Sequence, residues 1–371
     1  MKNQDPTPLI ICLCLLLVLG CDKNSEAPPT PSTPSRDLTT DRGNIAKHVA
    51  NHFIVPAFKD LHEATISLNN LAGEFVIGPT ETSLSSLKAA LKKTWKAWQV
   101  AAIYQMGPTE NQALRSAINL YPADELKIEG NISAGNFNLG TISNQAAEGL
   151  PALDYMLSSA DPTVTISSFA NQGHKDYLIA LTNHLEQLAG KVHQDWNEGP
   201  YLQDFTSDQA RGTDIGSAMG ILINTMDRHF QRFLRDGKVA IPAGIRSAGV
   251  IRPLAVEAFH GGYGGELLSD ALEAYTMLLT GEGLSGTKGM SMYDYLDNID
   301  QGDLKANFQT TLQSALTNVQ ELNNDLSKQI EEDNQAMINL FLTLQDIVTL
   351  IKSDLASVVG ITITNQDNDG D

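Results

Sequence analysis

Residues 178–200, LIALTNHLEQLAGKVHQDWNEGP, combine a regular apolar stripe with an abrupt stop. The apolar side chains recur at the three- and four-residue spacing of one helix face, and they are Leu178, Leu181, Leu185, Leu188, Val192 and Trp196. Gly199 and Pro200 then interrupt this period, because both residue types break helices. The stretch therefore predicts a long amphipathic helix followed by a boundary inside the chain.

Similar stripes lie on both sides of this boundary. The other predicted helices cover residues 45–68, 84–102, 144–157, 215–233, 253–279, 304–326 and 336–359. About four helices on each side predict an all-α protein made of two tandem four-helix bundles, with irregular insertions and a site at their interface. The first bundle is expected at residues 44–199 and the second at 200–362, followed by an acidic tail at 363–371.

Three segments interrupt the helical period, at residues 106–140, 238–253 and 281–291. The first is longer than a simple connecting loop in a compact domain usually is. Such insertions often carry binding residues. Two roles stay open for them, a binding site or a cap over the end of a bundle.

The N-terminus predicts export. The apolar run Leu9–Leu19 has 11 residues, whereas a membrane-spanning helix needs about 20, so residues 1–20 are predicted to be a signal peptide. Val18-Leu19-Gly20-Cys21 resembles a bacterial lipobox, which makes Cys21 the expected lipid attachment point; the alternative is an uncleaved hydrophobic anchor. Residues 21–43 are rich in Pro, Ser and Thr and are predicted to form a disordered tether.

We therefore expect a protein of the bacterial cell envelope, lipid-anchored at the outer membrane or on the periplasmic face. No second apolar run of spanning length is expected downstream. The membrane itself is the first predicted partner.

Charge and cysteine content exclude several classes of function. The 371 residues include 25 Lys plus Arg and 44 Asp plus Glu, a net charge of −19. Such a balance argues against nucleic-acid binding, which depends on clustered cations. The only cysteines are Cys12, Cys14 and Cys21. The folded part therefore has no disulfide framework, cysteine-ligated zinc site or cysteine nucleophile.

The segment around Pro151 carries the most distinctive chemistry. Pro151 fits only the first turn of a helix, so a helix is predicted to begin at Gly149 or Leu150. Glu148 lies just ahead of that positive helix end, and Asp154 lies a turn further in. The simpler alternative is that Glu148 caps the helix and Asp154 is exposed.

Histidines offer little support for a metal site. His48 and His52 are four residues apart and share one helix face, either as metal ligands or as part of a polar surface. No His-Glu-x-x-His sequence is present, so a zincin mechanism has no motif.

Several segments together resemble the imelysin family of exported bacterial proteins, which includes surface lipoproteins and iron-regulated envelope proteins. The resemblance covers nearly the whole folded part, and its segments are WKAWQVAAIYQMGP at 95–108, INLYPAD at 118–124, IPAGIRS at 241–247, VEAF at 256–259, DYLD at 294–297 and the ending at 355–371. It implies two four-helix bundles with a funnel-like site between them.

The family hallmark is Gly-x-His-x-x-Glu, regarded as part of its functional site and as a candidate metal-binding motif. Here Gly149 matches, Pro151 replaces the His and Asp154 replaces the Glu. A proline side chain can neither bind a metal nor transfer a proton.

Three functions remain possible. The first is a binding module whose cleft holds a small ligand, an iron species or an envelope partner protein in iron uptake. The second is a metallopeptidase, implied by the family, using an iron or calcium ion held by carboxylates from Asp124, Glu125, Glu148, Asp154 and Glu257. The third is a scaffold that docks another envelope protein.

If a site exists, we expect it to join residues from both halves. The expected members are Tyr121, Asp124, Glu148 and Asp154 from the first half, with Arg246 and Glu257 from the second. Arg246 would bind an anionic group, because a guanidinium pairs bidentately with carboxylates. The loss of the motif His leaves catalysis uncertain, and Asp154 and Glu148 are the main candidate metal ligands.

Overall fold

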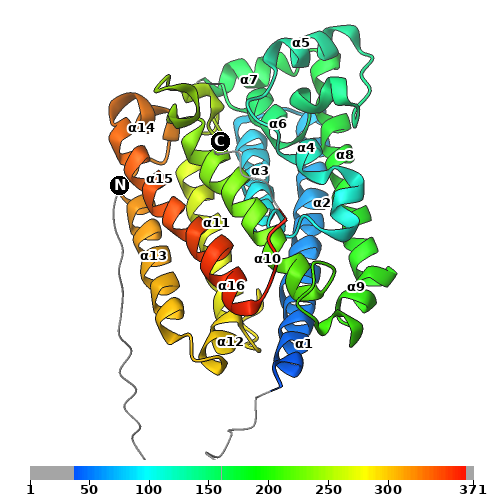
Figure 1. The fold of residues 1–371 in the computed structure, drawn as a ribbon. Helices are drawn as coiled ribbons and strands as arrows, with labels where there is room; N and C mark the ends of the chain where they lie inside the picture. Colours follow the sequence, from blue (N-terminus) through cyan, green and yellow to red (C-terminus); the bar gives the residue numbers. More distant parts are fainter. Residues whose placement is uncertain (1–36, 160, 365–371) are drawn as a thin grey trace, which may run out of the picture. The chain divides into compact units, whose positions relative to one another are not determined.

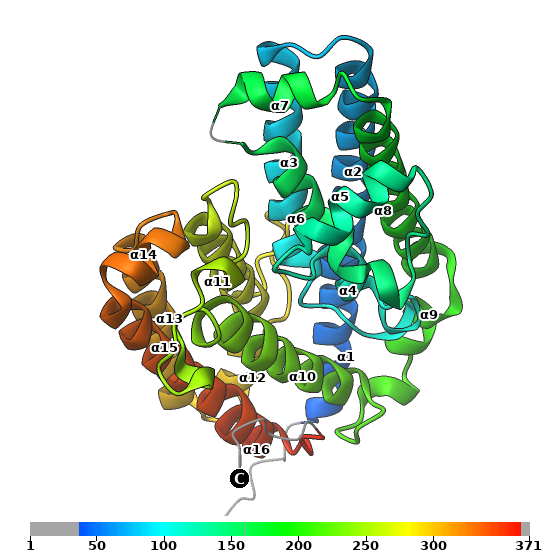
Figure 2. The ribbon, with the colours of Figure 1, turned by 90° about the horizontal axis from the view of Figure 1, so that it is seen from above.

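Helices make up most of the described chain (Figures 1 and 2). The structure, a computed structural model, describes residues 37–159 and 161–364. Within these residues the only β-type pairing is an isolated bridge between Glu282 and Lys288, so they contain no sheet. The all-α class predicted from the hydrophobic period is confirmed.

Three long helices pack together in the first half of the chain: α2 (Val55–Ile77), α3 (Glu81–Ala101) and α8 (Gln172–Glu198). The stripe that predicts α8 is buried at every position except Leu188, which is partly buried. Helix α1 (Leu38–Val49) and the π-helical turn η1 (Ala50–Ile54) continue into α2 with no non-helical residue between them.

A second group of helices follows. Helix α10 (Ala218–His229) continues as the π-helix η5 (Phe230–Ala240). It packs with α11 (Gly264–Thr280) and α15 (Asn334–Thr349), and α13 (Gly302–Gln320) packs against α11 and α15. Helix α11 also packs against α3, which joins the two groups.

Shorter elements connect these helices. They are η2 (Gly107–Gln112), α4 (Leu114–Ile118), α5 (Glu125–Ala134), η3 (Ile142–Ala147), α6 (Gly149–Leu157), α7 (Pro162–Ser168), α9 (Pro200–Phe205), η4 (Gln209–Arg211), η6 (Ile245–Ser247), η7 (Pro253–Ala255), α12 (Met292–Asn298), α14 (Leu326–Glu332), η8 (Leu350–Leu355) and α16 (Ala356–Val359).

The helix break at residues 199–200 is confirmed, since α8 ends at Glu198 and α9 begins at Pro200. Proline is favourable at a first helical position because its missing N–H has no partner there. The division into two domains, at 44–199 and 200–362, stays a prediction.

The helical body begins earlier than predicted. Residues 38–43 are the first turns of α1 rather than part of a tether. Arg42 Nε donates to the carbonyl oxygen of Arg211 at 2.8 Å, which ties these turns to η4. The predicted signal peptide, the lipidation site Cys21 and the tail beyond Thr364 lie outside the described residues.

The insertions are more helical than predicted. Residues 106–140 contain η2, α4 and α5, which have 6, 5 and 10 residues. Helices this short show too few turns for a hydrophobic period to be recognised. Two predicted helices were also wrong in extent: 144–157 is divided at Glu148, and the helix expected from residue 253 begins only at Gly264.

One described helical stretch, Asn334–Val359, is long and apolar enough to cross a membrane by length and composition alone, with a mean hydropathy of 1.3. The prediction that no second apolar run of spanning length lies downstream is therefore wrong. The stretch packs against η5 and α13 and buries Met337, Leu340 and Leu344 completely. A role as a core helix accounts for its apolar composition.

Two leucines of α15 test this assignment. Leu340 is 0% exposed and Leu342 is 56% exposed. We expect Leu340→Ala to lower the free energy of unfolding by about 2–5 kcal/mol, because it leaves a cavity in the core. Leu342→Ala should change it by less than about 0.5 kcal/mol. Urea unfolding followed by circular dichroism measures both, and equal losses would contradict the core assignment.

Candidate functional site

A recessed cavity of about 280 Å³ lies where α3, the start of α5, α6 and the segment before α11 meet. Its walls are aromatic, apolar and acidic, and they comprise Trp95, Tyr121, Pro122, Ala123, Glu125, Pro151, Asp154, Leu254, Val256, Ala258, Phe259 and His260. The cavity therefore draws side chains from both halves of the chain.

The start of α6 brings the degenerate motif to this cavity. Helix α6 begins at Gly149, as predicted, with Pro151 in its first turn. Gly149 has a φ of +78°, and a Cβ there would lie 2.4 Å from the carbonyl oxygen of Ile118. Only glycine fits this approach between α6 and α4.

Asp154 holds the loop before α11 against α6. Its Oδ2 accepts the backbone N–H groups of His260 at 3.0 Å and Gly261 at 3.1 Å, and its Oδ1 accepts the hydroxyl of Ser158 at 3.2 Å. Burial raises the pKa of this carboxyl, and the backbone donors oppose that rise. Asp154 is thus both a wall of the cavity and a structural tie.

Glu257 is the centre of a buried polar network beside the cavity. Its Oε1 accepts hydrogen bonds from Trp95 Nε1 at 3.0 Å, Gln99 Nε2 at 3.1 Å and Asn119 Nδ2 at 2.6 Å. Its Oε2 forms an ion pair with the ammonium of Lys238 on η5. Burial alone would raise the pKa of Glu257, but Lys238 and the side-chain donors hold it below its usual value. Burial lowers the pKa of Lys238.

Arg115 and Tyr121 lie near this network. The guanidinium of Arg115 stacks over the Phe233 ring at 3.8 Å and donates to the carbonyl oxygen of Ala102 at 3.0 Å. Burial lowers the pKa of Arg115 to about 10. Burial also raises the pKa of the Tyr121 phenol well above its usual value, so this hydroxyl stays neutral.

The backbone between Glu257 and Phe259 is strained. Ala258 has a φ of +55°, in the left-handed region that L-residues other than glycine rarely adopt. Such a conformation costs of order 1–3 kcal/mol and persists where the surroundings enforce it, often at functional sites. Here hydrogen bonds hold the residues on both sides of Ala258. Glu257 accepts from Trp95 and Asn119, and the His260 N–H donates to Asp154.

The predicted site residues thus separate into two groups. Tyr121 and Asp154 line the cavity. Glu257 does not line it but accepts a hydrogen bond from Trp95, which does. Asp124 caps α5 by accepting the Lys127 N–H at 3.0 Å, and its neighbour Glu125 reaches the cavity instead.

The other two predicted residues have separate structural contacts. Glu148 does not cap α6; its buried Oε2 accepts the Gly140 N–H at 2.7 Å, and burial raises the pKa of its carboxyl. Arg246 pairs with Asp236 at 3.0 Å and lies over the Phe341 ring, so it does not line the cavity.

Sequence reasoning missed Trp95, Asn119 and Lys238 as members of the site. Trp95 belongs to an apolar stripe, which predicts a core residue, although its indole N–H donates a hydrogen bond to Glu257. Lys238 is the first residue of the segment 238–253, which is predicted to interrupt the helical period. No sequence signal marked Lys238 as buried, because η5 also carries Arg232, Arg235 and Asp236 and has the composition of a polar helix.

The side chains do not fit a metal ion. Among residues 37–159 and 161–364, no group of three or more His, Cys, Asp or Glu is placed to hold one. Asp154 already accepts three hydrogen bonds, and Pro151 supplies no donor atom. His48 binds the carbonyl oxygen of Gly281 at 2.8 Å and stacks near His52, which leaves that pair as a structural contact.

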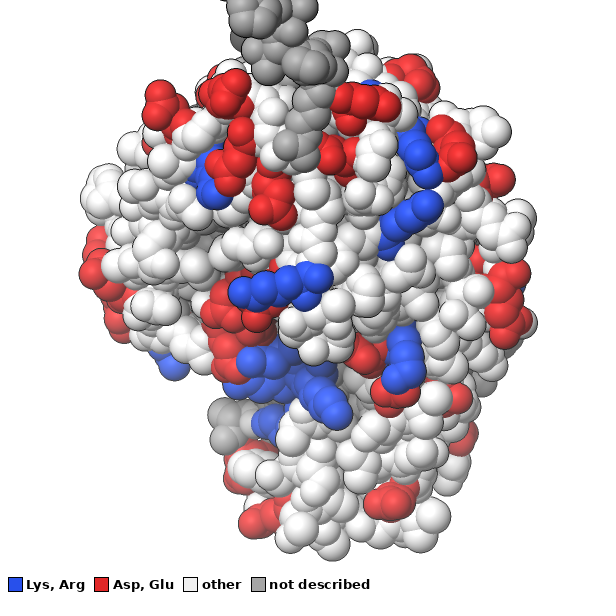
Figure 3. Space-filling model, turned by 90° about the horizontal axis from the view of Figure 1, so that it is seen from below, with Lys and Arg blue, Asp and Glu red and all other residues white. Residues whose placement is uncertain are grey.

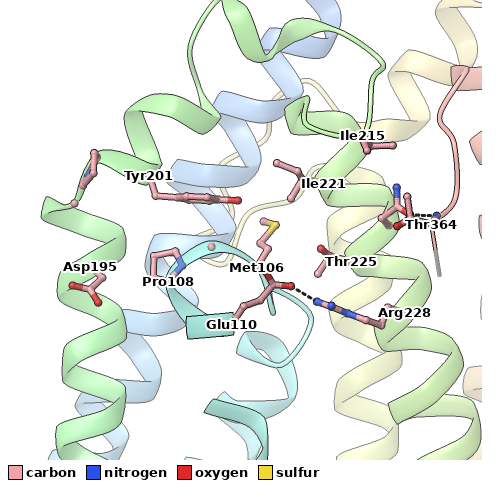
Figure 4. Close-up of a pocket in the computed structure, with 14 residues that line it drawn as sticks. Met106, Pro108, Glu110, Asp195, Tyr201, Ile215, Ile221, Thr225, Arg228 and Thr364 are labelled. Atoms are coloured by element: carbon pink, nitrogen blue, oxygen red, sulfur yellow. Dashed lines mark hydrogen bonds and ion pairs between the residues drawn. The ribbon is translucent and has the colours of Figure 1, made fainter. Parts of the chain in front are cut away.

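A larger cavity of about 630 Å³ lies elsewhere, between η2, α9 and α10 (Figure 4). Its main ionic contact joins Arg228 to Glu110 at 2.9 Å, and Arg228 also donates to the carbonyl oxygen of Gln105. The charges of Arg228 and Glu110 therefore compensate each other in this cavity. Strained backbone and buried carboxylates gather instead at the smaller cavity, which we take as the candidate site.

Both signs of charge occur on the face of the molecule that is seen from below. Figure 3 shows acidic side chains scattered over the face seen from below, with Lys and Arg side chains gathered near its centre. A scattered negative charge mainly promotes solubility.

Comparison with known proteins agrees with this architecture. A sequence model described as Imelysin matches residues 54–353. The crystal structure of an imelysin-like protein from Psychrobacter arcticum 273-4 is similar, with a TM-score of 0.70, 18% identity and coverage of 89% of this chain and 99% of that chain. A protein from Parabacteroides distasonis ATCC 8503, described as an iron-regulated protein A precursor, gives a TM-score of 0.72, 14% identity and coverage of 90% and 96%. No curated protein matches significantly.

The fold and the site define an all-helical protein with a buried polar network beside a recessed cavity. The family match covers well over half of the chain, so the chain belongs to the imelysin family. At their low identities, the two similar structures show a shared fold alone.

The ion pair of Glu257 and Lys238 yields a stability prediction. Glu257→Gln leaves a buried ammonium without its counter-ion, so the free energy of unfolding should fall by about 3–5 kcal/mol. The double variant Glu257→Gln/Lys238→Met should lose less than the sum of the two single variants, because no charge remains unpaired. Urea unfolding measures this double-mutant cycle. Additive losses would contradict the ion pair.

The same pair predicts a pH dependence. Since the folded-state pKa of Glu257 is lowered, its stabilisation is present above the unfolded pKa of about 4.3 and is lost as the pH falls through the lower folded-state value. The stability difference between the wild type and Glu257→Gln should therefore narrow below about pH 4. Thermal unfolding at a series of pH values tests this, and a constant difference would contradict it.

Proposed function

We propose that the protein is a membrane-anchored ligand-binding protein of the bacterial cell envelope, associated with iron uptake. Its ligand would bind in the cavity between Trp95, Tyr121 and Asp154. The observation that carries the proposal is that residues far apart in sequence wall one recessed cavity beside a buried, fully engaged carboxylate.

Preorganisation supports binding at this cavity. Trp95 is held by Glu257, and the His260 and Gly261 backbone is held by Asp154. A wall fixed by hydrogen bonds loses little conformational freedom when a ligand binds. Apolar walls with a few placed polar groups are typical of small-molecule sites.

Envelope anchoring rests on the N-terminal sequence. The apolar run Leu9–Leu19 and the lipobox-like residues before Cys21 support export and lipid attachment. The Parabacteroides distasonis protein of similar fold is described as iron-regulated, which supports the association with iron.

The donor set argues for binding rather than hydrolysis. Metal-assisted hydrolysis needs two or three fixed ligands, an open coordination position and a base. Pro151 replaces the imidazole of the family motif, and Asp154 holds a loop with its oxygens. No hydrolytic step is therefore assigned to these residues.

We expect the purified full-length protein to leave an unfolded protein substrate such as casein uncut. The measurement is release of acid-soluble peptides with and without a chelator, and the matched control is Asp154→Asn purified in the same way. Cleavage that the chelator abolishes and the control lacks would support the metallopeptidase alternative instead.

A variant that fills the cavity tests ligand binding. Ala123 lines the cavity just before α5, and Ala123→Trp would occupy its space. Leu126, in the first turn of α5, is 87% exposed and does not line the cavity. We expect at least one compound from a panel of ferrous ion, ferric citrate, haem and small metabolites to raise the melting temperature of the full-length protein in detergent.

That rise should disappear in Ala123→Trp and persist in Leu126→Trp. Binding at 100 times the dissociation constant stabilises by about 2.7 kcal/mol, which is readily measured as a thermal shift. A panel without any Ala123-dependent shift would overturn the proposed function.

A further inference from the structure

We propose that the ligand of this cavity is a small organic cation, a protonated amine or quaternary ammonium compound with an apolar body. This inference rests on the proposed ligand-binding function. It is carried by the charges and the aromatic surfaces that wall the cavity.

The charged lining is acidic. Glu125 and Asp154 line the cavity, whereas no Lys or Arg does. His260 is the remaining ionisable group apart from Tyr121, and its Nε2 lies 3.5 Å from Glu125 Oε1. A recessed site lined by carboxylates attracts positive charge, and its partial exclusion of water strengthens that attraction.

Lys238 and Arg115, the two cations around Glu257, have partners of their own. Lys238 forms the ion pair with Glu257, so this pair adds no net charge behind the wall. Arg115 stacks on Phe233 and donates to the Ala102 carbonyl oxygen. These contacts therefore leave neither cation to pair with the carboxylates of the cavity wall.

Three aromatic side chains complete the walls: Trp95, Tyr121 and Phe259. The orientation of Trp95 is fixed, because its N–H is bound to Glu257 and its ring packs edge-to-face with Tyr263 at 5.7 Å. Aromatic faces bind organic cations through the ring quadrupole, as in the aromatic cages that recognise quaternary ammonium ligands.

The same lining disfavours other ligand classes. An anion would meet the carboxylates of Glu125 and Asp154 with no cationic side chain in the lining to receive it. A bare metal ion would need several free oxygen or nitrogen donors, and no suitable group exists among the described residues. A diffuse organic charge needs neither and can use the apolar walls.

Two pairs of probes separate charge from shape. Choline is compared with its uncharged analogue 3,3-dimethyl-1-butanol, and protonated phenethylamine with 2-phenylethanol, by calorimetric titration of the full-length protein in detergent. At least one cation should bind about tenfold more tightly than its neutral counterpart, as expected for a desolvated cation–aromatic contact of about 1–2 kcal/mol.

Variants assign the effect to the cavity. Glu125→Gln should weaken binding of the cation about threefold or more and leave its neutral counterpart unchanged, since only the charge of the wall is altered. Phe259→Leu should likewise reduce the preference for the cation. Glu129→Gln is the matched control, because Glu129 is on the same helix but binds Tyr155 Oη and does not line the cavity.

The outcomes separate this inference from the proposed function. If neither cation is preferred while another compound shows an Ala123-dependent thermal shift, the cavity binds ligands and the cation inference is overturned. The cation inference is also overturned if the Ala123→Trp variant still binds the cation in preference to its neutral counterpart. If no compound at all depends on Ala123, the proposed function fails together with the inference.

Discussion

The buried carboxylate of Glu257 is the interaction on which the site depends. An ionised carboxylate inside a protein costs several kcal/mol unless donors and a counter-ion surround it. Here the donors come from α3, from Asn119 and from η5. Satisfying one carboxylate therefore fixes three separate parts of the chain relative to each other. The strained conformation of Ala258 is a direct consequence, because its neighbours are held on both sides.

Asp154 provides the second tie and changes how the family motif is understood. In this chain the carboxylate of the degenerate motif holds the backbone of residues 260 and 261, and Pro151 stabilises the first turn of α6. The side chain of Pro151 can neither transfer a proton nor bind a metal. The cavity has aromatic, apolar and acidic walls that hydrogen bonds hold in place, a site suited to recognition.

The sequence predicted the long helices well, since stripes such as that of α8 extend over several turns and identify the buried face. It also predicted that Glu257 and Asp154 lie at one site, and the structure places Asp154 in the cavity wall and Glu257 next to it, bound to Trp95. It could not identify Lys238 or Asn119, because their importance arises only when distant segments meet around one carboxylate. Arg246 and Asp124 carry suitable chemistry, but local contacts with Asp236 and the start of α5 occupy them. The short helices of residues 107–134 were missed for lack of a repeated period.

Under the proposed function, the cavity beside Trp95 and Asp154 holds a ligand in the cell. Native mass spectrometry of the full-length protein, isolated gently from the membrane of its own cells, detects such a ligand. We expect one bound small molecule per chain in the wild type and in Leu126→Trp, and none in Ala123→Trp. An adduct that is equally abundant in Ala123→Trp, or a wild type isolated without any bound molecule, would contradict it.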